Sequence, residues 1–217
     1  MDRKKFIQQS TLLTSAGLLM PSLTSFRKAS QKIGANDTLV IGAIGINGMG
    51  WSDTKALLNI PGVKLAAICD VDQNVLEKRE AEMKAQGVRV KTFTDYRKLL
   101  EEKEIDAVVI GSPDHWHALM MIHACQAGKH VYVEKPIGNS VGECQAMVAA
   151  QEHYGTVVQV GQWQRSQQHF QDAVNYLATG VLGPIRTVKV WCYQGWMRPD
   201  PIVPDSAPPK GVDYQRW

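Results

Sequence analysis

The chain has 217 residues, a formal net charge of +3 and an apolar fraction of 44%. This length predicts one full domain and part of another, and the apolar fraction is enough for a sizeable core. The small charge, with no basic stretch interleaved with aromatic residues on one predicted helix, argues against nucleic acid as a partner. The four cysteines show no close pairing and no zinc-like spacing, so we expect free thiols and no metal site.

The N-terminal segment, residues 1–34, has the layout of an export signal. A basic stretch that includes Lys4 precedes a modestly apolar run from Leu12 to Met20, and Pro21 follows. The segment resembles a twin-arginine signal with Lys4 in place of the second arginine, which predicts export to the periplasm. The alternative is a disordered basic arm on a cytoplasmic protein. The apolar run is too short and too polar to predict a membrane span.

From residue 35 onward the sequence alternates strand and helix patterns. Apolar runs predict strands at residues 39–45, 63–69, 88–93, 107–110, 130–133 and 157–160. Helices are predicted between and after them, at residues 49–58, 74–86, 96–103, 114–127, 140–154 and 166–179. Such alternation is typical of a parallel sheet with helices on both faces. We therefore expect a Rossmann-type doubly wound α/β domain over residues 35–183.

The pattern changes after residue 183. Residues 185–193 alternate apolar and polar side chains, which predicts a half-buried strand of the antiparallel type. We interpret residues 184–217 as the beginning of a second domain. A single strand cannot satisfy its own backbone or cover its apolar face, so we expect the sequence to be an incomplete copy of a longer protein.

A glycine-rich turn follows the first predicted strand and precedes a predicted helix. A bound pyrophosphate needs close approach of the backbone and N–H donors at a helix start, and glycines in such a turn supply both. Gly45 and Gly50 match the G-x-G-x-x-G frame, whereas Asn47 holds the middle position. Gly48 and Met49 complete the predicted coenzyme-binding turn. The alternative is a tight turn between two buried elements.

Asp70 ends the second predicted strand, where a carboxylate can accept hydrogen bonds from both hydroxyls of a ribose. A carboxylate at this place repels a 2′-phosphate, so NAD is the expected coenzyme and NADP is disfavoured. The alternative role for Asp70 is to cap the following helix. Asp72 can serve as that cap instead.

The segment SPDHWH, residues 112–117, follows another strand at its carboxyl end, which is the side where ligands of open α/β sheets bind. Ser112, Pro113, His115 and His117 are its candidate coenzyme-binding residues. The two histidines are two positions apart, so on a helix they face different ways and a shared metal is not expected.

Glu134, Lys135 and Pro136 come at the end of the strand that follows. Proline disfavours helical backbone at the residue before it, so Lys135 is held extended and its ammonium group can project into the crevice. A lysine beside a nicotinamide can bind a substrate hydroxyl and relay its proton while hydride leaves the carbon. The alternative is a surface lysine paired with a carboxylate. The convergence of three strand ends on one crevice favours catalysis by Lys135.

Residues 38–217 resemble the Gfo/Idh/MocA family of nicotinamide-dependent sugar and polyol oxidoreductases. The motifs that carry the resemblance are the glycine turn at 41–50, the CDVD run at 69–72, the SPDHWH segment at 112–117 and the AGKHVYVEKP run at 127–136. The resemblance implies a Rossmann domain followed by an α/β domain with an open, mostly antiparallel sheet. It also implies that Lys135 is the catalytic lysine, that Glu134 and His117 help to hold the cofactor, and that the full-length protein forms a homo-oligomer.

The sequence departs from the family pattern at two places. Asn47 replaces the middle glycine, and Trp163 stands where many relatives carry Asn or Gln. Gln162 and Trp163 are the candidate cofactor-binding residues of this segment, and Gln162 or Gln164 is the substitute for the contact that the change at Trp163 puts in question. Arg165 is a candidate substrate contact in the same segment.

These features predict an exported NAD-dependent oxidoreductase that acts on a sugar, a polyol or a derivative. The first alternative is an NAD-dependent glycoside hydrolase, which oxidises the sugar transiently, eliminates the leaving group and reduces the product again. The second is a non-catalytic nucleotide-binding module. Because most of the second domain is missing from the sequence, we expect the 217-residue chain alone to be inactive.

Overall fold

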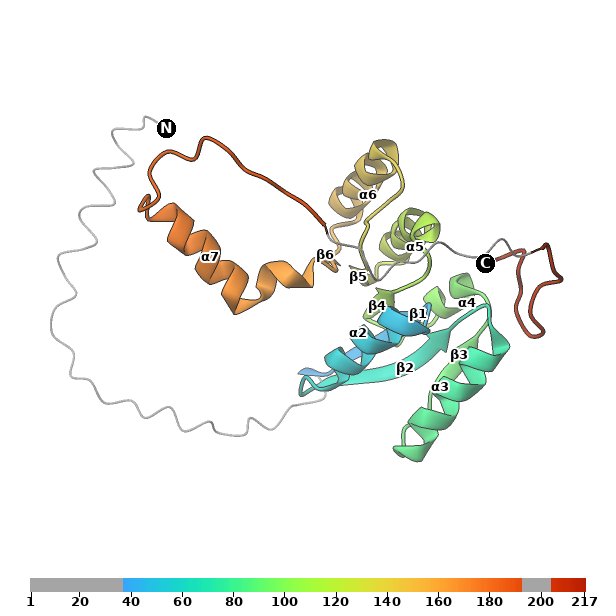
Figure 1. The fold of residues 1–217 in the computed structure, drawn as a ribbon. Coiled ribbons are helices and arrows are strands. Elements are labelled where there is room, and N and C mark those ends of the chain that lie inside the picture. Colours follow the sequence, from blue (N-terminus) through green and yellow to red (C-terminus); the bar gives the residue numbers. More distant parts are fainter. Residues whose placement is uncertain (1–36, 193–203) are drawn as a thin grey trace, which may run out of the picture. The chain divides into compact units, whose positions relative to one another are not determined.

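The structure is a computed structural model that describes residues 37–192 and 204–217 (Figure 1). The predicted export signal at residues 1–34 lies outside this part of the chain. Within the described ranges, no helix is long and apolar enough to cross a membrane.

Six parallel strands form one sheet, in the spatial order β3-β2-β1-β4-β5-β6. The strands are β1 (Leu39–Ile44), β2 (Val63–Cys69), β3 (Lys91–Phe93), β4 (Ala107–Ile110), β5 (His130–Val133) and β6 (Val158–Val160). The helices between them are α2 (Gly48–Leu58), α3 (Gln73–Ala85), α4 (Tyr96–Leu100), α5 (Asp114–Gln126) and α6 (Val141–Tyr154). The strand order reverses between β1 and β4, and ligands of open α/β sheets bind outside the carboxyl ends of such strands. The predicted Rossmann-type fold is confirmed.

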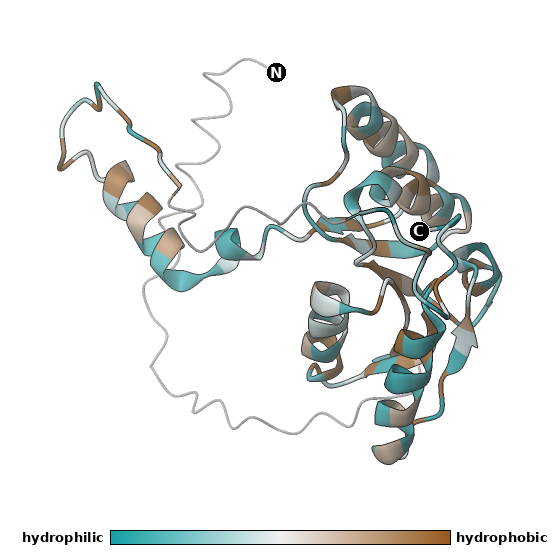
Figure 2. Ribbon diagram, turned by 45° about the vertical axis from the view of Figure 1, so that its right-hand side comes forward, coloured by the Kyte–Doolittle hydropathy of each residue, from teal (hydrophilic) through white to brown (hydrophobic). Residues whose placement is uncertain are grey.

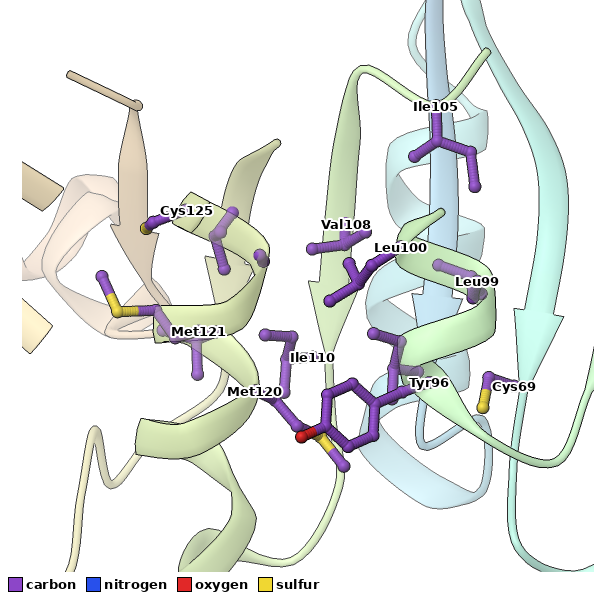
Figure 3. Close-up of a cluster of buried hydrophobic side chains, with 14 of the residues drawn as sticks. Cys69, Tyr96, Leu99, Leu100, Ile105, Val108, Ile110, Met120, Met121 and Cys125 are labelled. Atoms are coloured by element: carbon purple, nitrogen blue, oxygen red, sulfur yellow. The ribbon is translucent and has the colours of Figure 1, made fainter. Parts of the chain in front are cut away.

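Helices cover both faces of the sheet, and each face has its own apolar core. On one face α4, α5 and α6 pack against the strands, with Ile110 beside Met120 (Figure 3). On the other face Trp51 of α2 and Leu76 of α3 pack with strand residues such as Ile68. Figure 2 shows hydrophobic colouring concentrated in the sheet and hydrophilic colouring along α3. Strands buried on both faces have continuous apolar sequences, which explains why these runs predict strands correctly.

Polar side chains determine where four of the helices begin. The N-caps of α2, α3, α4 and α6 are Asn47, Asp72, Asp95 and Ser140, and each accepts a hydrogen bond from a backbone N–H of the first turn. Glu143 also reaches back, because its Oε2 accepts from the backbone N–H of Asn139 at 2.6 Å. Asp72 takes the role of helix cap, which leaves Asp70 available for another function.

The end of the predicted domain differs from expectation. The helix predicted at 166–179 is confirmed as α7, Gln168–Ala178, and an unpredicted 3₁₀ turn, Trp163–Ser166, precedes it. Residues 185–192 form no strand, so that prediction is wrong for the described residues, and Tyr193 lies outside them. No described strand lies alongside to accept or donate backbone hydrogen bonds, and Val190 is 91% exposed. Alternation alone cannot stabilise a strand without a partner.

Candidate functional site

The turn between β1 and α2 packs so closely against the end of β4 that only glycine fits at its contact points. Gly45 has a φ of 75°, and a Cβ on it would lie 2.6 Å from the Cα of Ser112. A Cβ on Gly50 would collide with the carbonyl oxygen of Gly45. Gly48 has a φ of 51° and faces open space, because a Cβ on it would meet nothing within 4 Å. The backbone at Gly48 is therefore accessible to a ligand at the start of α2.

Asn47 shows why the motif tolerates a residue other than glycine at its middle position. Its φ of −96° and ψ of 157° are ordinary extended values, which any residue adopts. Its Oδ1 accepts a hydrogen bond from the N–H of Gly48 at 3.2 Å. Asn47 thus caps α2 and lines the cavity described below, whereas Met49 is exposed and outside the cavity wall.

Asp70 connects the end of β2 to the glycine turn. Its Oδ2 accepts from the backbone N–H of Ile46 at 2.9 Å, and its Oδ1 accepts from the N–H of Asp72 at 3.1 Å. A carboxylate oxygen can accept more than one hydrogen bond, so both oxygens keep capacity for a ligand hydroxyl. Burial raises the pKa of Asp70, and the hydrogen bonds to Asp72 and Ile46 oppose that rise.

A cavity of about 870 Å³ opens at the carboxyl ends of β1, β2 and β4. Gly45, Asn47, Gly48, Asp70, Ser112 and Pro113 line it, so six of the predicted coenzyme-binding residues share this space. Trp116 and Met120 of α5 form part of its apolar wall, and Asp70 contributes a polar group. A large apolar cavity with a few polar groups is the usual form of a small-molecule site.

One wall of this cavity comes from residues 209–217, which sequence reasoning does not assign to the site. The backbone N–H of Gln73 donates to the carbonyl of Gly211 at 2.9 Å, and the N–H of Asp213 donates to Val71 at 3.0 Å. The carbonyl oxygen of Trp217 lies at the far end of this segment, where it accepts from the indole Nε1 of Trp116 at 3.0 Å. These contacts are made mostly by backbone atoms, so no side-chain pattern could have indicated them.

The two candidate histidines have different surroundings. His115 is exposed, and its Nε2 lies 3.0 Å from the carbonyl oxygen of Trp217. His117 is buried, with Nδ1 2.7 Å from the carbonyl oxygen of Pro136 and Nε2 2.8 Å from that of Ser112. Neither histidine lines the cavity. His117 instead links the loop at Pro136 to the loop at Ser112. Within residues 37–192 and 204–217, no three His, Cys, Asp or Glu side chains are grouped so as to hold a metal ion.

Glu134 and Lys135 stand at the carboxyl end of β5 but outside the cavity wall. Lys135 is exposed, and its amine forms no ion pair with any carboxylate among the described residues. Glu134 is only 4% exposed, and its carboxylate accepts from the phenol of Tyr132 at 3.3 Å. The alternative view of Lys135, as one half of a surface ion pair, is thus not supported.

The segment after β6 is not part of the cavity. Gln162, Trp163 and Arg165 are exposed, and Trp163 and Arg165 belong to the 3₁₀ turn that follows β6. None of the three, nor Gln164, lines the cavity. Their proposed contacts with coenzyme and substrate remain predictions.

A doubly wound parallel sheet, with a glycine turn and a strand-end carboxylate on one cavity, defines the class of dinucleotide-binding α/β domains. The family model described as "Oxidoreductase family, NAD-binding Rossmann fold" matches residues 39–162. The chain belongs to this family, which is that of the Gfo/Idh/MocA oxidoreductases. The match confirms the predicted family and, because this is an NAD-binding family, the predicted coenzyme NAD.

Known proteins of two kinds are similar to the chain. A "Glycosyl hydrolase family 109 protein" of Shewanella putrefaciens is 37% identical over 121 residues, which cover 54% of this chain and 26% of that protein. The inositol 2-dehydrogenase of Salmonella typhimurium is 28% identical over 148 residues, covering 67% of this chain and 43% of that protein. The chain therefore spans between a quarter and less than half of the length of these relatives.

Solved structures agree with this assignment. The myo-inositol 2-dehydrogenase of Lactobacillus plantarum superimposes with a TM-score of 0.62 at 31% identity, covering 68% of this chain and 43% of that chain. The scyllo-inositol dehydrogenase of Lactobacillus casei, crystallised with NAD(H) and scyllo-inositol, gives a TM-score of 0.61 at 26% identity, covering 67% and 42%.

Proposed function

We propose that the whole protein is an NAD-dependent oxidoreductase that acts on a cyclic polyol or a sugar. The observation that carries the proposal is the shared cavity of the glycine turn and Asp70, at the carboxyl edge of an NAD-binding family fold. The named activities of the inositol dehydrogenases among its relatives support a polyhydroxylated ring as the substrate class.

The residues present fit the coenzyme. Its pyrophosphate would lie against the backbone at Gly45 and Gly48, where glycine leaves space and α2 begins. Its adenosine would occupy the cavity, with the ribose hydroxyls donating to Asp70 and the base near Trp116. Asp70 would disfavour the extra phosphate of NADP. When bound, the nicotinamide supplies the hydride acceptor for the reaction.

Lys135 is the residue we assign to proton transfer. An exposed amine with no described ion-pair partner is available to a substrate hydroxyl. It would hold that hydroxyl by a hydrogen bond and take its proton as the carbon is oxidised. Glu134 would help to hold the coenzyme beside it. His117 would keep Lys135 in place, because it links Pro136 to the Ser112 loop.

The substitution Lys135→Met tests this assignment. Met keeps the length of the side chain but cannot transfer a proton, so kcat should fall by about 100-fold or more with NAD affinity nearly unchanged. Lys98→Met is the matched control, because Lys98 is an exposed lysine paired with Glu101 at 2.9 Å, on α4. Unchanged polyol oxidation in the Lys135 variant would overturn the role of this lysine.

A second candidate function is NAD-dependent glycoside hydrolysis. It is favoured by the 37% identity to a protein named as a member of glycosyl hydrolase family 109. The two functions differ in a simple assay with a chromogenic glycoside and added NAD. A hydrolase releases the aglycone with no net change in nicotinamide absorbance, whereas a dehydrogenase reduces NAD in proportion to the polyol consumed.

We also propose that the whole protein is exported to the periplasm and associates with itself. The basic-then-apolar segment at residues 1–34 supports export, and the family resemblance supports a homo-oligomer. Fractionation of cells, with a variant in which Arg3 and Lys4 are replaced by Gln, tests the first. Light scattering of the whole protein tests the second.

A further inference from the structure

A second acidic residue, Asp53 of α2, lies beside Glu134 in the structure. Its Oδ2 is buried and accepts no hydrogen bond from any described donor. Buried polar atoms in folded proteins are nearly always satisfied, so a single exception at this place calls for a physical explanation.

Glu134 is held firmly by its surroundings. Its Oε1 accepts from the phenol of Tyr132 at 3.3 Å, and its Oε2 accepts from the backbone N–H of Lys135 at 3.2 Å. Gly161 packs against the carboxylate, because a Cβ at that position would lie 2.8 Å from the Cδ of Glu134. No described cation forms an ion pair with Glu134.

Two neighbouring ionised carboxylates can only accept hydrogen bonds, so they cannot bond to each other and their charges repel. One proton between them changes this, because the protonated acid becomes a donor. Burial, then the charge of Glu134 and a hydrogen bond to it, raise the pKa of Asp53 to about 6. The pKa of Tyr132 rises to about 12 through burial and the charges of Asp53 and Glu134.

Among the described residues, Glu134 acts on the pKa of Asp53, and Asp53 in turn acts on that of Tyr132. Glu134 and Tyr132 come from β5 and its carboxyl end, and neither brings a positive charge. The nearest lysine on its own helix, Lys55, is exposed. The pair is therefore not neutralised by a described cation, and a proton is the remaining way to compensate it.

We propose that Asp53 is a positioning residue, whose protonated carboxyl group donates a hydrogen bond to Glu134 and fixes the Glu134 carboxylate for the coenzyme. This inference rests on the proposed function, in which Glu134 helps to hold the coenzyme. Loss of the proton places a second negative charge beside Glu134 and weakens coenzyme binding. Binding of NAD above the pKa of Asp53 is then accompanied by uptake of a proton.

Calorimetry of NAD binding to the whole protein tests this coupling. Titrations at pH 7 in two buffers of different ionisation enthalpy give the number of protons taken up. The wild-type protein should take up a substantial part of one proton, and its Kd should rise about threefold or more between pH 5.5 and 8. Asp53→Asn keeps a donor that does not titrate, so proton uptake and the pH dependence of Kd should both disappear.

Asp53→Ala removes the donor, so it should weaken NAD binding at every pH by about fivefold or more relative to Asp53→Asn. Equal affinity of the Ala and Asn variants, or proton uptake that persists in both, would overturn the proposal. A purely structural role for Asp53 predicts stability changes with no change in proton uptake.

A measurement on the wild-type protein covers the case in which the variants fail to fold. The side-chain ¹³C resonance of Asp53 should titrate with a midpoint near 6 and not near the ordinary value of 3.8. An ordinary midpoint overturns the shared proton whether or not coenzyme binds. Failure of the wild-type protein to bind NAD at any pH would instead contradict the proposed function. The two failures can be told apart, because the ¹³C titration is done without coenzyme.

Discussion

The imidazole of His117 bridges Pro136 and Ser112, which belong to loops after different strands of the sheet. Its Nδ1 lies 2.7 Å from the carbonyl oxygen of Pro136, and its Nε2 lies 2.8 Å from that of Ser112. His117 is 2% exposed, so water does not compete for either contact. One buried side chain thus holds the loop of Lys135 against a loop that lines the cavity.

His117→Ala should therefore act on catalysis at a distance. Loss of two buried contacts should lower the free energy of unfolding by about 2–4 kcal/mol. Displacement of the Lys135 loop should reduce kcat by about 10–100-fold. The affinity for AMP, which represents the adenosine half of the coenzyme, should change less. His153→Ala, at an exposed site on α6, should change neither quantity appreciably. An equal fall in kcat for both variants would contradict the bridging role.

Asp70 should determine the choice of coenzyme. Asp70→Ser should raise the Kd for NAD about tenfold, because the ribose hydroxyls lose the carboxylate that accepts their hydrogen bonds. The same change should reduce the preference for NAD over NADP. Asp72→Ala is the control in the same segment, since it removes the cap of α3 at a cost of about 1 kcal/mol of stability. That control should leave the ratio of the two Kd values unchanged. Fluorescence titration with both coenzymes measures it.

The wall formed by residues 209–217 should contribute to binding of the adenosine half. Gly211 has a φ of 92°, and a Cβ there would lie 2.7 Å from Nδ2 of Asn74. Gly211→Ala should strain this contact, loosen the segment and weaken AMP binding several-fold. Gly87→Ala is the matched control: Gly87 has a similar φ of 75°, but its Cβ would meet nothing within 4 Å. Both variants should lose about 1 kcal/mol of stability, and only the first should bind AMP more weakly.

The free energy of unfolding should depend on pH in a way that reflects the raised pKa of Asp53. The folded state keeps a proton on Asp53 up to about pH 6, whereas the unfolded chain releases it near 3.8. Unfolding therefore releases a proton between these values, and the contribution of Asp53 to the free energy of unfolding falls as the pH rises through this window. Asp53→Asn should lack this component. Urea denaturation at several pH values measures the free energy of unfolding of the wild-type protein and of Asp53→Asn. If this free energy changes with pH in the same way for both proteins, the proton is not on Asp53.

Much of the Rossmann fold could be predicted because its strands are buried on both faces. Continuous apolar runs such as Leu39–Ile44 have few other interpretations when a glycine turn follows. The strand predicted at 88–93 is too long, because only Lys91–Phe93 pairs with β2. The half-exposed pattern at 185–192 is the more serious error, since alternation indicates a strand only where a partner strand exists.

The shared position of the glycine turn and Asp70 on one cavity could be predicted, because it depends on residue type and on where each strand ends. The wall at residues 209–217 could not, since this segment takes part in the hydrogen bonds that attach it through its backbone atoms, which any sequence supplies. The electrostatic interaction between Asp53 and Glu134 is equally hidden in the sequence. It joins a helix to a strand end far along the chain, and neither carboxylate has a local pattern that points to the other.

Calorimetric titration of the whole protein with NAD and with NADP tests the central claim most directly. We expect saturable binding of NAD, weaker binding of NADP, and a loss of the difference in Asp70→Ser. Absence of heat with either coenzyme in its oxidised or reduced form, from a folded protein that contains no bound nicotinamide, would contradict it.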